Sequence, residues 1–236
     1  MIKLRQFLGR ATIVGAAIAG LVAVSAAQAS VVVLNFAGLN GDAQEHPLTY
    51  YDGGSGSLGS GPGPNYGIVF GTDALACSGQ PGGNCNSSAI PGGPGANLLF
   101  FLTGPGDMMN VPAGFDTGFS FFYSAINNPG NVDVWSGLDA TGSLLATINL
   151  PVTPSTPGSN GCYPSGSFCP YMAAGASFAG TALSVNFSGT ANQIAFADIT
   201  LGSANAGGTT VPEPATLALL GIGLAGLGFS RRRKLS

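Results

Sequence analysis

The chain has 236 residues, and its seven Lys and Arg residues all lie in the first ten positions or at positions 231–234. Of its ten acidic residues only Glu213 lies outside positions 30–210, so this body carries nine negative formal charges and no Lys or Arg. Without these cations the body cannot neutralise phosphates, which excludes nucleic acid as a partner and also the phosphate-binding folds that need a lysine.

Residues 1–29 are predicted to be a secretory signal peptide. Lys3, Arg5 and Arg10 precede an apolar run over residues 11–24, and the small-x-small sequence Ala27-Gln-Ala29 follows. An apolar run of about 14 residues is shorter than the roughly 20 that a spanning helix needs. We therefore expect cleavage after Ala29 and export of the rest of the chain, rather than a retained anchor.

Residues 30–202 are predicted to form one all-β domain. Gly- and Pro-rich turns divide this body at residues 61–64, 81–83, 91–95, 104–106 and 128–130. Strand-like segments lie at residues 31–36, 67–70, 97–102, 118–124, 132–138, 143–150, 183–188 and 193–201. Short strands separated by turns predict an antiparallel β-sandwich of the jelly-roll or lectin-like kind with Gly/Pro-rich loops.

Two strand predictions are specific enough to assign faces. Phe119, Phe121 and Tyr123 alternate with Ser120, Phe122 and Ser124, and the first set is expected to face the core. The strand at 183–188 is expected to form a hairpin with the strand at 193–201 through a five-residue connection, residues 188–192. Residues 53–64 are so rich in Gly and Ser that a mobile loop is expected there.

Four cysteines occur as two closely spaced pairs, Cys77 with Cys85 and Cys162 with Cys169, in loop-like sequence. An exported chain meets an oxidising compartment, so we predict two local disulfides, although four cysteines allow three pairings. The spacing is too long for a zinc site, and no metal or other cofactor is expected from these thiols.

Asp133 and Trp135 are two positions apart on a predicted strand, which places a carboxylate and a large aromatic ring on one face. Such a pair can stack on a sugar ring and accept hydrogen bonds from its hydroxyl groups. The alternative, which the usual burial of Trp favours, is that Trp135 belongs to the core and Asp133 ends the strand. Asn131 and Asp133 are also candidates for Ca²⁺ ligands.

No convincing catalytic constellation is present, so we do not expect an enzyme. A hydrolase triad would need His46, the body's only histidine, and no Gly-x-Ser-x-Gly elbow accompanies it. A pair of carboxylates such as Asp133 with Asp139 or Asp116 would suffice for glycoside hydrolysis, but the sequence does not fix their separation.

The C-terminal segment has three parts after a linker at residues 203–210. They are the motif Val211-Pro212-Glu213-Pro214, an uncharged run at 215–230 predicted to be a transmembrane helix, and a basic membrane stop made of Arg231, Arg232, Arg233 and Lys234. The two prolines favour an extended motif before the helix. The run of about 16 residues would span only about 24 Å, against a hydrocarbon core of about 30 Å, and the cations would remain cytoplasmic.

This tail, residues 211–236, resembles the PEP-CTERM sorting signal. The resemblance implies recognition of Pro212, Glu213 and Pro214 by an exosortase-type processing enzyme, and a transient stay in the inner membrane. Delivery to the cell envelope, the surface or the extracellular matrix would follow. The segment 115–150 also resembles a meander seen in proteins with this tail, where carbohydrate-binding or lectin-like sandwiches are usual.

Three functions are therefore open. The first is a structural or adhesive component of an exopolysaccharide or biofilm matrix, the second a carbohydrate-binding module, and the third a hydrolase of matrix polysaccharide. Exopolysaccharide is the expected partner besides the processing enzyme.

Overall fold

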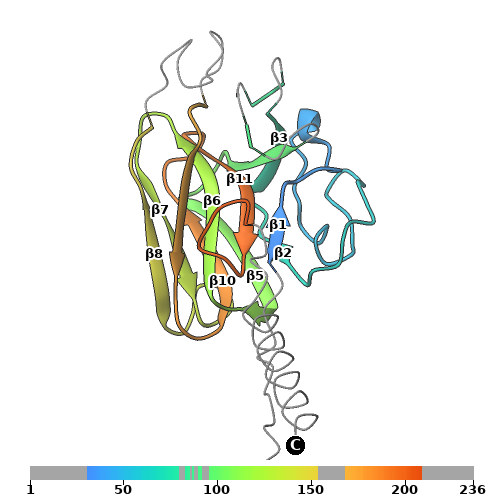
Figure 1. Ribbon diagram of the computed structural model, residues 1–236. Helices are drawn as coiled ribbons and strands as arrows, with labels where there is room; N and C mark the ends of the chain where they lie inside the picture. Colours follow the sequence, from blue (N-terminus) through green and yellow to red (C-terminus); the bar gives the residue numbers. More distant parts are fainter. Residues whose placement is uncertain are drawn as a thin grey trace, which may run out of the picture. The chain divides into compact units, whose positions relative to one another are not determined.

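The computed structural model describes residues 31–79, 83–85, 87, 90–91, 96–153 and 168–208. These residues belong to one compact unit, Ala29–Pro212, in which two antiparallel sheets pack face to face (Figure 1). The predicted all-β sandwich is confirmed. Its elements are β1 (Val32–Leu34), a 3₁₀ turn η1 (Gly41–Ala43), β2 (Val69–Phe70), β3 (Ala74–Ser78), β4 (Asn97–Phe101), β5 (Gly106–Phe115), β6 (Gly118–Ala125), β7 (Gly130–Trp135), β8 (Leu144–Leu150), β9 (Met172–Ser177), β10 (Ala182–Ser188) and β11 (Ile194–Leu201).

The two sheets differ in strand order. The first sheet runs β3-β4-β11-β6-β9, with β1 also paired to β11, and the second runs β2-β5-β10-β7-β8. Consecutive strands often lie in different sheets, so the chain crosses the sandwich repeatedly. This arrangement brings β5, β10, β7 and β8 side by side, although β10 lies far from the others in the sequence.

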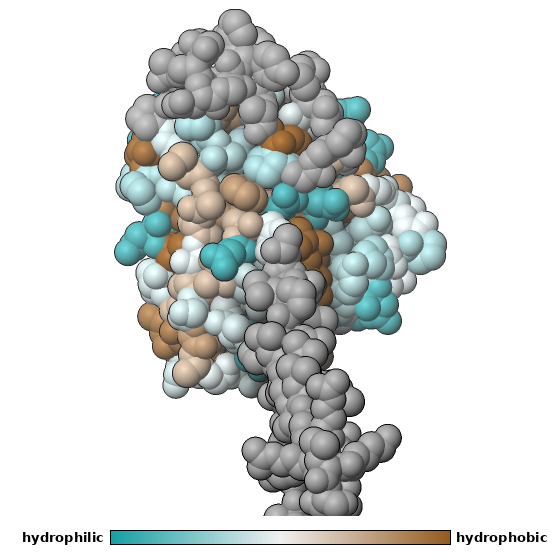
Figure 2. Space-filling view, in the orientation of Figure 1, coloured by the Kyte–Doolittle hydropathy of each residue, from teal (hydrophilic) through white to brown (hydrophobic). Residues whose placement is uncertain are grey.

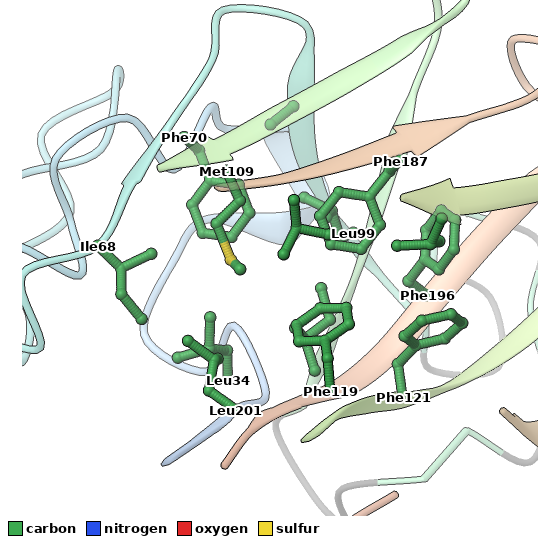
Figure 3. Packing of buried hydrophobic residues seen from close by; sticks show 14 of the residues in the cluster. Leu34, Ile68, Phe70, Leu99, Met109, Phe119, Phe121, Phe187, Phe196 and Leu201 are labelled. Carbon is green, nitrogen blue, oxygen red and sulfur yellow. The ribbon is translucent and has the colours of Figure 1, made fainter. Parts of the chain in front are cut away.

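The main core lies between the sheets and combines aromatic rings with aliphatic side chains (Figure 3). Phe119 and Phe121 of β6 are fully buried, as predicted, and Tyr123 is nearly so. Phe187 of β10 and Phe196 of β11 meet across the core with ring centroids 5.0 Å apart in a T-shaped arrangement. Because each buried Phe removes a large apolar surface from water, this cluster is a main source of the sandwich's stability.

The first sheet is covered on its other face as well. A second apolar cluster there includes Leu98, Phe100 and both cysteines of the predicted Cys77–Cys85 disulfide, which is confirmed with a Cα separation of 5.5 Å. Cys77 lies on β3 rather than in a loop, so this bridge ties a strand to the segment that follows it. The predicted bridge between Cys162 and Cys169 stays a prediction, since Cys162 lies outside the described residues.

The predicted hairpin between the strands at 183–188 and 193–201 is wrong, although both strands exist. β10 pairs with β5 and β7 in the second sheet, while β11 pairs with β1, β4 and β6 in the first. The connection crosses the sandwich, held by Gly189 N–H on the Pro105 carbonyl at 2.9 Å and Asn192 N–H on the Phe101 carbonyl at 2.9 Å. The two apolar faces therefore meet across the core instead of lying on one sheet.

The meander expected for residues 115–150 is also corrected. β6 lies in the first sheet and β7 and β8 in the second, so only the β7–β8 pair is a hairpin. β7 ends at Trp135, three residues earlier than the predicted strand, because residues 136–143 form a loop.

Glu45 fixes the Gly- and Ser-rich loop that was expected to be mobile. Its side chain is fully buried and accepts hydrogen bonds from the N–H groups of Asn40 (2.7 Å), Leu58 (2.8 Å) and Ser60 (3.1 Å). Burial alone raises the pKa of Glu45, but the hydrogen bonds from Ser60, Asn40 and Leu58 outweigh burial and hold this pKa below its ordinary value. A buried carboxylate here is stabilised by backbone donors, without a cation.

The outer surface carries polar and apolar residues side by side. Figure 2 shows teal, pale and brown areas next to one another on this side of the molecule. The start of the predicted linker is attached to the sandwich, because Ser120 Oγ donates to the Ser203 carbonyl at 2.9 Å and Gly207 N–H donates to Thr200 Oγ1 at 3.1 Å.

Candidate functional site

β7 carries Asp133 and Trp135, the predicted sugar-binding pair. Along this strand Val132 and Val134 are fully buried, whereas Asn131, Asp133 and Trp135 are half-buried. The alternation places the last three on the outward face of the second sheet. The alternative assignment of Trp135 to the core is wrong, because the two valines occupy the core positions of this strand.

Neighbouring strands continue this outward face with polar side chains. Asp133 lies opposite Asn186 of β10 on one side and Thr147 of β8 on the other. We call this surface the polar face and define it by Asn131, Asp133, Trp135, Thr147, Asn149, Asn186 and Ser188.

Hydrogen bonds within the polar face hold the Asp133 carboxylate in place. Thr147 Oγ1 donates to Asp133 Oδ1 at 2.7 Å, and Asn131 Nδ2 donates to Asp133 Oδ2 at 2.8 Å. Both oxygens accept from neutral donors and retain further lone pairs. The carboxylate is thus fixed and still able to accept hydrogen bonds from a ligand. The proposed role of Asn131 and Asp133 as Ca²⁺ ligands stays a prediction.

The loop at residues 136–143 is fixed on the sheet beside Trp135. Ser184 of β10 lies opposite Trp135 and is fully buried. Its Oγ accepts a hydrogen bond from the Ala140 N–H at 3.0 Å and donates one to the Gly137 carbonyl at 2.6 Å. Asp139 of the loop exchanges two hydrogen bonds with Asn110, at 2.6 and 2.9 Å. The buried indole Nε1 of Trp135 has no partner among the described residues. Trp135 therefore lies at a fixed edge of the polar face.

A second acidic feature, which the sequence did not indicate, lies where β5 begins. Asp73 and Asp107 both line a pocket of about 370 Å³, which we call the Asp73–Asp107 pocket. Burial raises the pKa of Asp107 to about 7; hydrogen bonds from the Met108 and Ala74 backbones lower it, and the charge of Asp73 raises it further. In the sequence Asp107 directly follows a Gly-Pro-Gly turn, where a solvent-exposed side chain is the usual expectation.

The other residues considered for catalysis, His46, Asp116 and Asp139, each have a local hydrogen-bond partner. The ring Nδ1 of His46 lies 2.8 Å from the Ala74 carbonyl oxygen, and since a carbonyl only accepts, this nitrogen donates. Asp116 is exposed and accepts from Thr117 Oγ1, while Asp139 is bonded to Asn110. In the part of the chain that the structure describes, no three His, Cys, Asp or Glu side chains form a metal-binding group.

The predicted signal peptide and sorting tail lie in parts of the chain that the structure does not describe, and they are compared by sequence. Residues 210–234 match the PEP-CTERM protein-sorting motif. The chain carries a PEP-CTERM sorting signal. This signal implies export, processing by an exosortase-type enzyme and sorting to the cell surface.

The match spans every part of the predicted tail. It includes the recognition motif Val211, Pro212, Glu213 and Pro214, the apolar run 215–230, and the basic residues Arg231, Arg232, Arg233 and Lys234. That the run crosses the membrane and that the four basic residues stop it there both stay predictions, because these positions lie outside the described residues. Among the residues that are described, no helix has the length and apolar character to cross a membrane.

Comparisons of the whole chain give little more. No curated protein matches it significantly. A solved structure with some likeness is the catalytic domain of a GH87 alpha-1,3-glucanase in complex with tetrasaccharides, at 15% identity and a TM-score of 0.33. The match covers 64% of this chain and 30% of that one, and a likeness of this extent supports no conclusion about activity.

Proposed function

We propose that the sandwich is the adhesive part of a PEP-CTERM protein of the extracellular matrix and that it binds exopolysaccharide through the polar face. The observation that carries the proposal is the arrangement of amide, hydroxyl and carboxylate groups on β10, β7 and β8 next to the half-buried ring of Trp135. Sugar-binding sites combine a few fixed polar groups with an aromatic ring that contacts the apolar side of the pyranose.

The chemistry of the polar face favours extended, neutral polysaccharide. Asp133 accepts hydrogen bonds, and the amides of Asn149 and Asn186 both donate and accept, which matches the alternating character of sugar hydroxyl groups. With no Lys or Arg between residues 30 and 210, the body has no cationic side chain to attract uronic acid or sulfate groups. Its nine negative formal charges would repel strongly acidic polymers.

The hydrogen bonds that the carboxylates of Asp133 and Asp139 already make favour adhesion over hydrolysis. Asp133 already accepts two hydrogen bonds from neutral donors, and Asp139 is engaged with Asn110. Neither arrangement leaves an acid and a base facing each other across an open site, which glycoside hydrolysis requires.

The test measures retention of the protein on the native exopolysaccharide by affinity electrophoresis. Trp135→Ala and Asp133→Asn should each reduce retention at least tenfold, whereas Tyr66→Ala, which removes a 44%-exposed aromatic ring elsewhere, should leave it unchanged. Thermal midpoints are measured in parallel, because Trp135→Ala also removes a half-buried side chain. Unchanged retention in both polar-face variants would rule out this surface, and release of reducing ends from the polymer would replace adhesion by hydrolysis.

A further inference from the structure

The Asp73–Asp107 pocket contains a carboxylate oxygen that the protein leaves unsatisfied. The Asp107 side chain is only 5% exposed, and its buried Oδ2 has no hydrogen-bond partner within the described part of the chain. A buried carboxylate oxygen without a partner is costly, and a bound ion or water is one of the arrangements that satisfy such a group.

A second carboxylate lies in the same pocket. Asp73 is half-buried, and its Oδ1 accepts a hydrogen bond from Thr103 Oγ1 at 2.9 Å. The charges of Asp73 and Asp107 repel each other, and no Lys or Arg exists between residues 30 and 210 to offset this. His46 is the body's single histidine, and its Nδ1 donates to the Ala74 carbonyl. The charged group that acts on Asp107 is another carboxylate, Asp73, so the pocket has no lysine or arginine as a counter-ion.

Three other residues that line the pocket, Thr72, Asn186 and Ser188, have oxygen-bearing side chains. The rest of the lining is formed by Gly71, Pro105, Gly106 and Met108. Gly71 provides the room, because a Cβ at this position would lie 2.8 Å from Asp107 Oδ1. Two carboxylates surrounded by neutral oxygen donors are the ligand set of a hard divalent cation.

We propose that the Asp73–Asp107 pocket binds one Ca²⁺ ion. Asp107 and Asp73 supply the negative charge, and side-chain oxygens of the lining together with water complete the coordination. Ca²⁺ accepts six to eight oxygen ligands in irregular geometry, whereas Mg²⁺ demands a near-ideal octahedron and retains its waters. Oxygen sites of extracellular modules typically bind Ca²⁺ with dissociation constants on the order of 10⁻⁴ to 10⁻³ M.

This inference goes beyond the proposed adhesion and does not depend on it. The pocket reaches the polar face at Asn186 and Ser188, but its carboxylates come from the loop after β2 and from the start of β5. Loss of sugar binding would leave the prediction of a cation site unaffected.

The experiment is a titration of the exported, processed protein with CaCl₂ by isothermal titration calorimetry after removal of metal with EDTA. One ion should bind per chain, and the thermal midpoint should rise with CaCl₂ concentration. Asp107→Asn and Asp73→Asn should each weaken binding at least tenfold. Asp116→Asn, which removes the same charge from an exposed position, and Asp133→Asn, which alters the other predicted calcium ligand, should bind as the wild type does.

The proposal would be overturned by the lack of a saturable single-site isotherm or by wild-type affinity in Asp107→Asn. A loss of binding in Asp133→Asn but not in Asp107→Asn, or an equal loss in Asp116→Asn, would also overturn it. Circular dichroism establishes that each variant is folded before it is titrated. If Asp107→Asn fails to fold, the half-exposed Asp73 still decides the question, because wild-type affinity in Asp73→Asn would exclude the pocket.

Discussion

Asp107→Asn should make the metal-free protein more stable at pH 8 and change its stability little at pH 4. In the folded chain burial raises the pKa of Asp107 from 3.8 to about 7, against the smaller opposing effect of two backbone N–H groups. Asp73 is the charged group that faces it. The substitution keeps the shape of the side chain and removes the charge, so its effect isolates the cost of ionising a buried carboxyl group.

The number of protons bound in the folded and unfolded states determines whether stability rises or falls with pH. Between pH 3.8 and about 7 the folded protein retains a proton on Asp107 that the unfolded chain has released, so stability decreases as pH rises through this window. At about 1.36 kcal/mol per pKa unit, the full shift corresponds to roughly 4 kcal/mol, which is an upper bound because relaxation and water entry lower the real cost. Asp107→Asn should therefore raise the free energy of unfolding at pH 8 by up to this amount.

The assay is urea unfolding followed by the fluorescence of Trp135, the chain's single tryptophan, in EDTA at pH 4 and pH 8. Asp116→Asn serves as the control, because it removes an exposed carboxylate and should shift the midpoint little at either pH. The reasoning would be refuted if Asp107→Asn raised the free energy of unfolding equally at both pH values or lowered it at pH 8. Either result would show that ionising the buried Asp107 carboxyl does not destabilise the fold.

Two further predictions concern Glu45 and the sorting signal. Glu45→Gln should lower the unfolding free energy at pH 7 by about 2–3 kcal/mol, since it disrupts charge-assisted bonds to three backbone N–H groups. The pKa of Glu45 is lowered in the folded state, so this contribution to stability is present above pH 4.5 and is lost as pH falls through the folded-state pKa. If Glu45→Gln lowered the unfolding free energy equally at pH 7 and pH 3 in urea titrations, the prediction would be contradicted. Glu213→Ala should cause an uncleaved form to accumulate in the inner membrane, and deletion of the processing enzyme should do the same. Processing would be disproved if mass spectrometry found the mature wild-type chain intact through Ser236.

The strands were largely predictable, but their partners were not. Apolar residues alternate with polar ones in the sequence of β10, and Val185 and Phe187 are core residues, as is Phe196 of β11. The same alternation arises whether the two strands pair in one sheet or face each other across a core, because it reports only which side of a strand is apolar. A five-residue connection is compatible with both geometries, so the pairing depends on tertiary packing such as the Phe187–Phe196 contact.

Three strands, β3, β5 and β9, were missed, and for β5 and β9 the reason is local. β5 contains Asn110, Pro112 and Gly114, all of which are unfavourable in regular strands. Its pairing with β10 is irregular just where Pro112 lies, between the pairs that join Asn110 to Ser184 and Phe115 to Ala182. A bulge tolerates a residue that lacks an N–H group, so the breaker signal there marks an irregularity within one long strand. β9 is rich in Ala and Gly and carries little strand signal.

The two candidate sites differ in how far the sequence could reveal them. The position of Asp133 and Trp135 on one face follows from spacing along a single strand. The meeting of Asp73 and Asp107 does not, because Asp73 lies just before β3 of the first sheet and Asp107 lies in β5 of the second. The pairing of β2 with β5, the Gly71 N–H bond to the Met108 carbonyl at 2.8 Å and the hydrogen bond from the Ala74 backbone to Asp107 bring the two segments together.

The lack of cations in the body decides how each carboxylate must be stabilised. A folded chain ordinarily pairs a buried acid with Lys or Arg, and between residues 30 and 210 this option does not exist. Glu45 is satisfied by three backbone N–H groups, and Asp133 by the side chains of Asn131 and Thr147. Among the described carboxylates, only Asp107 has a buried oxygen that accepts no hydrogen bond. Because that oxygen belongs to a pocket that also holds Asp73, the missing positive charge is best supplied by an ion from the medium that the exported protein enters.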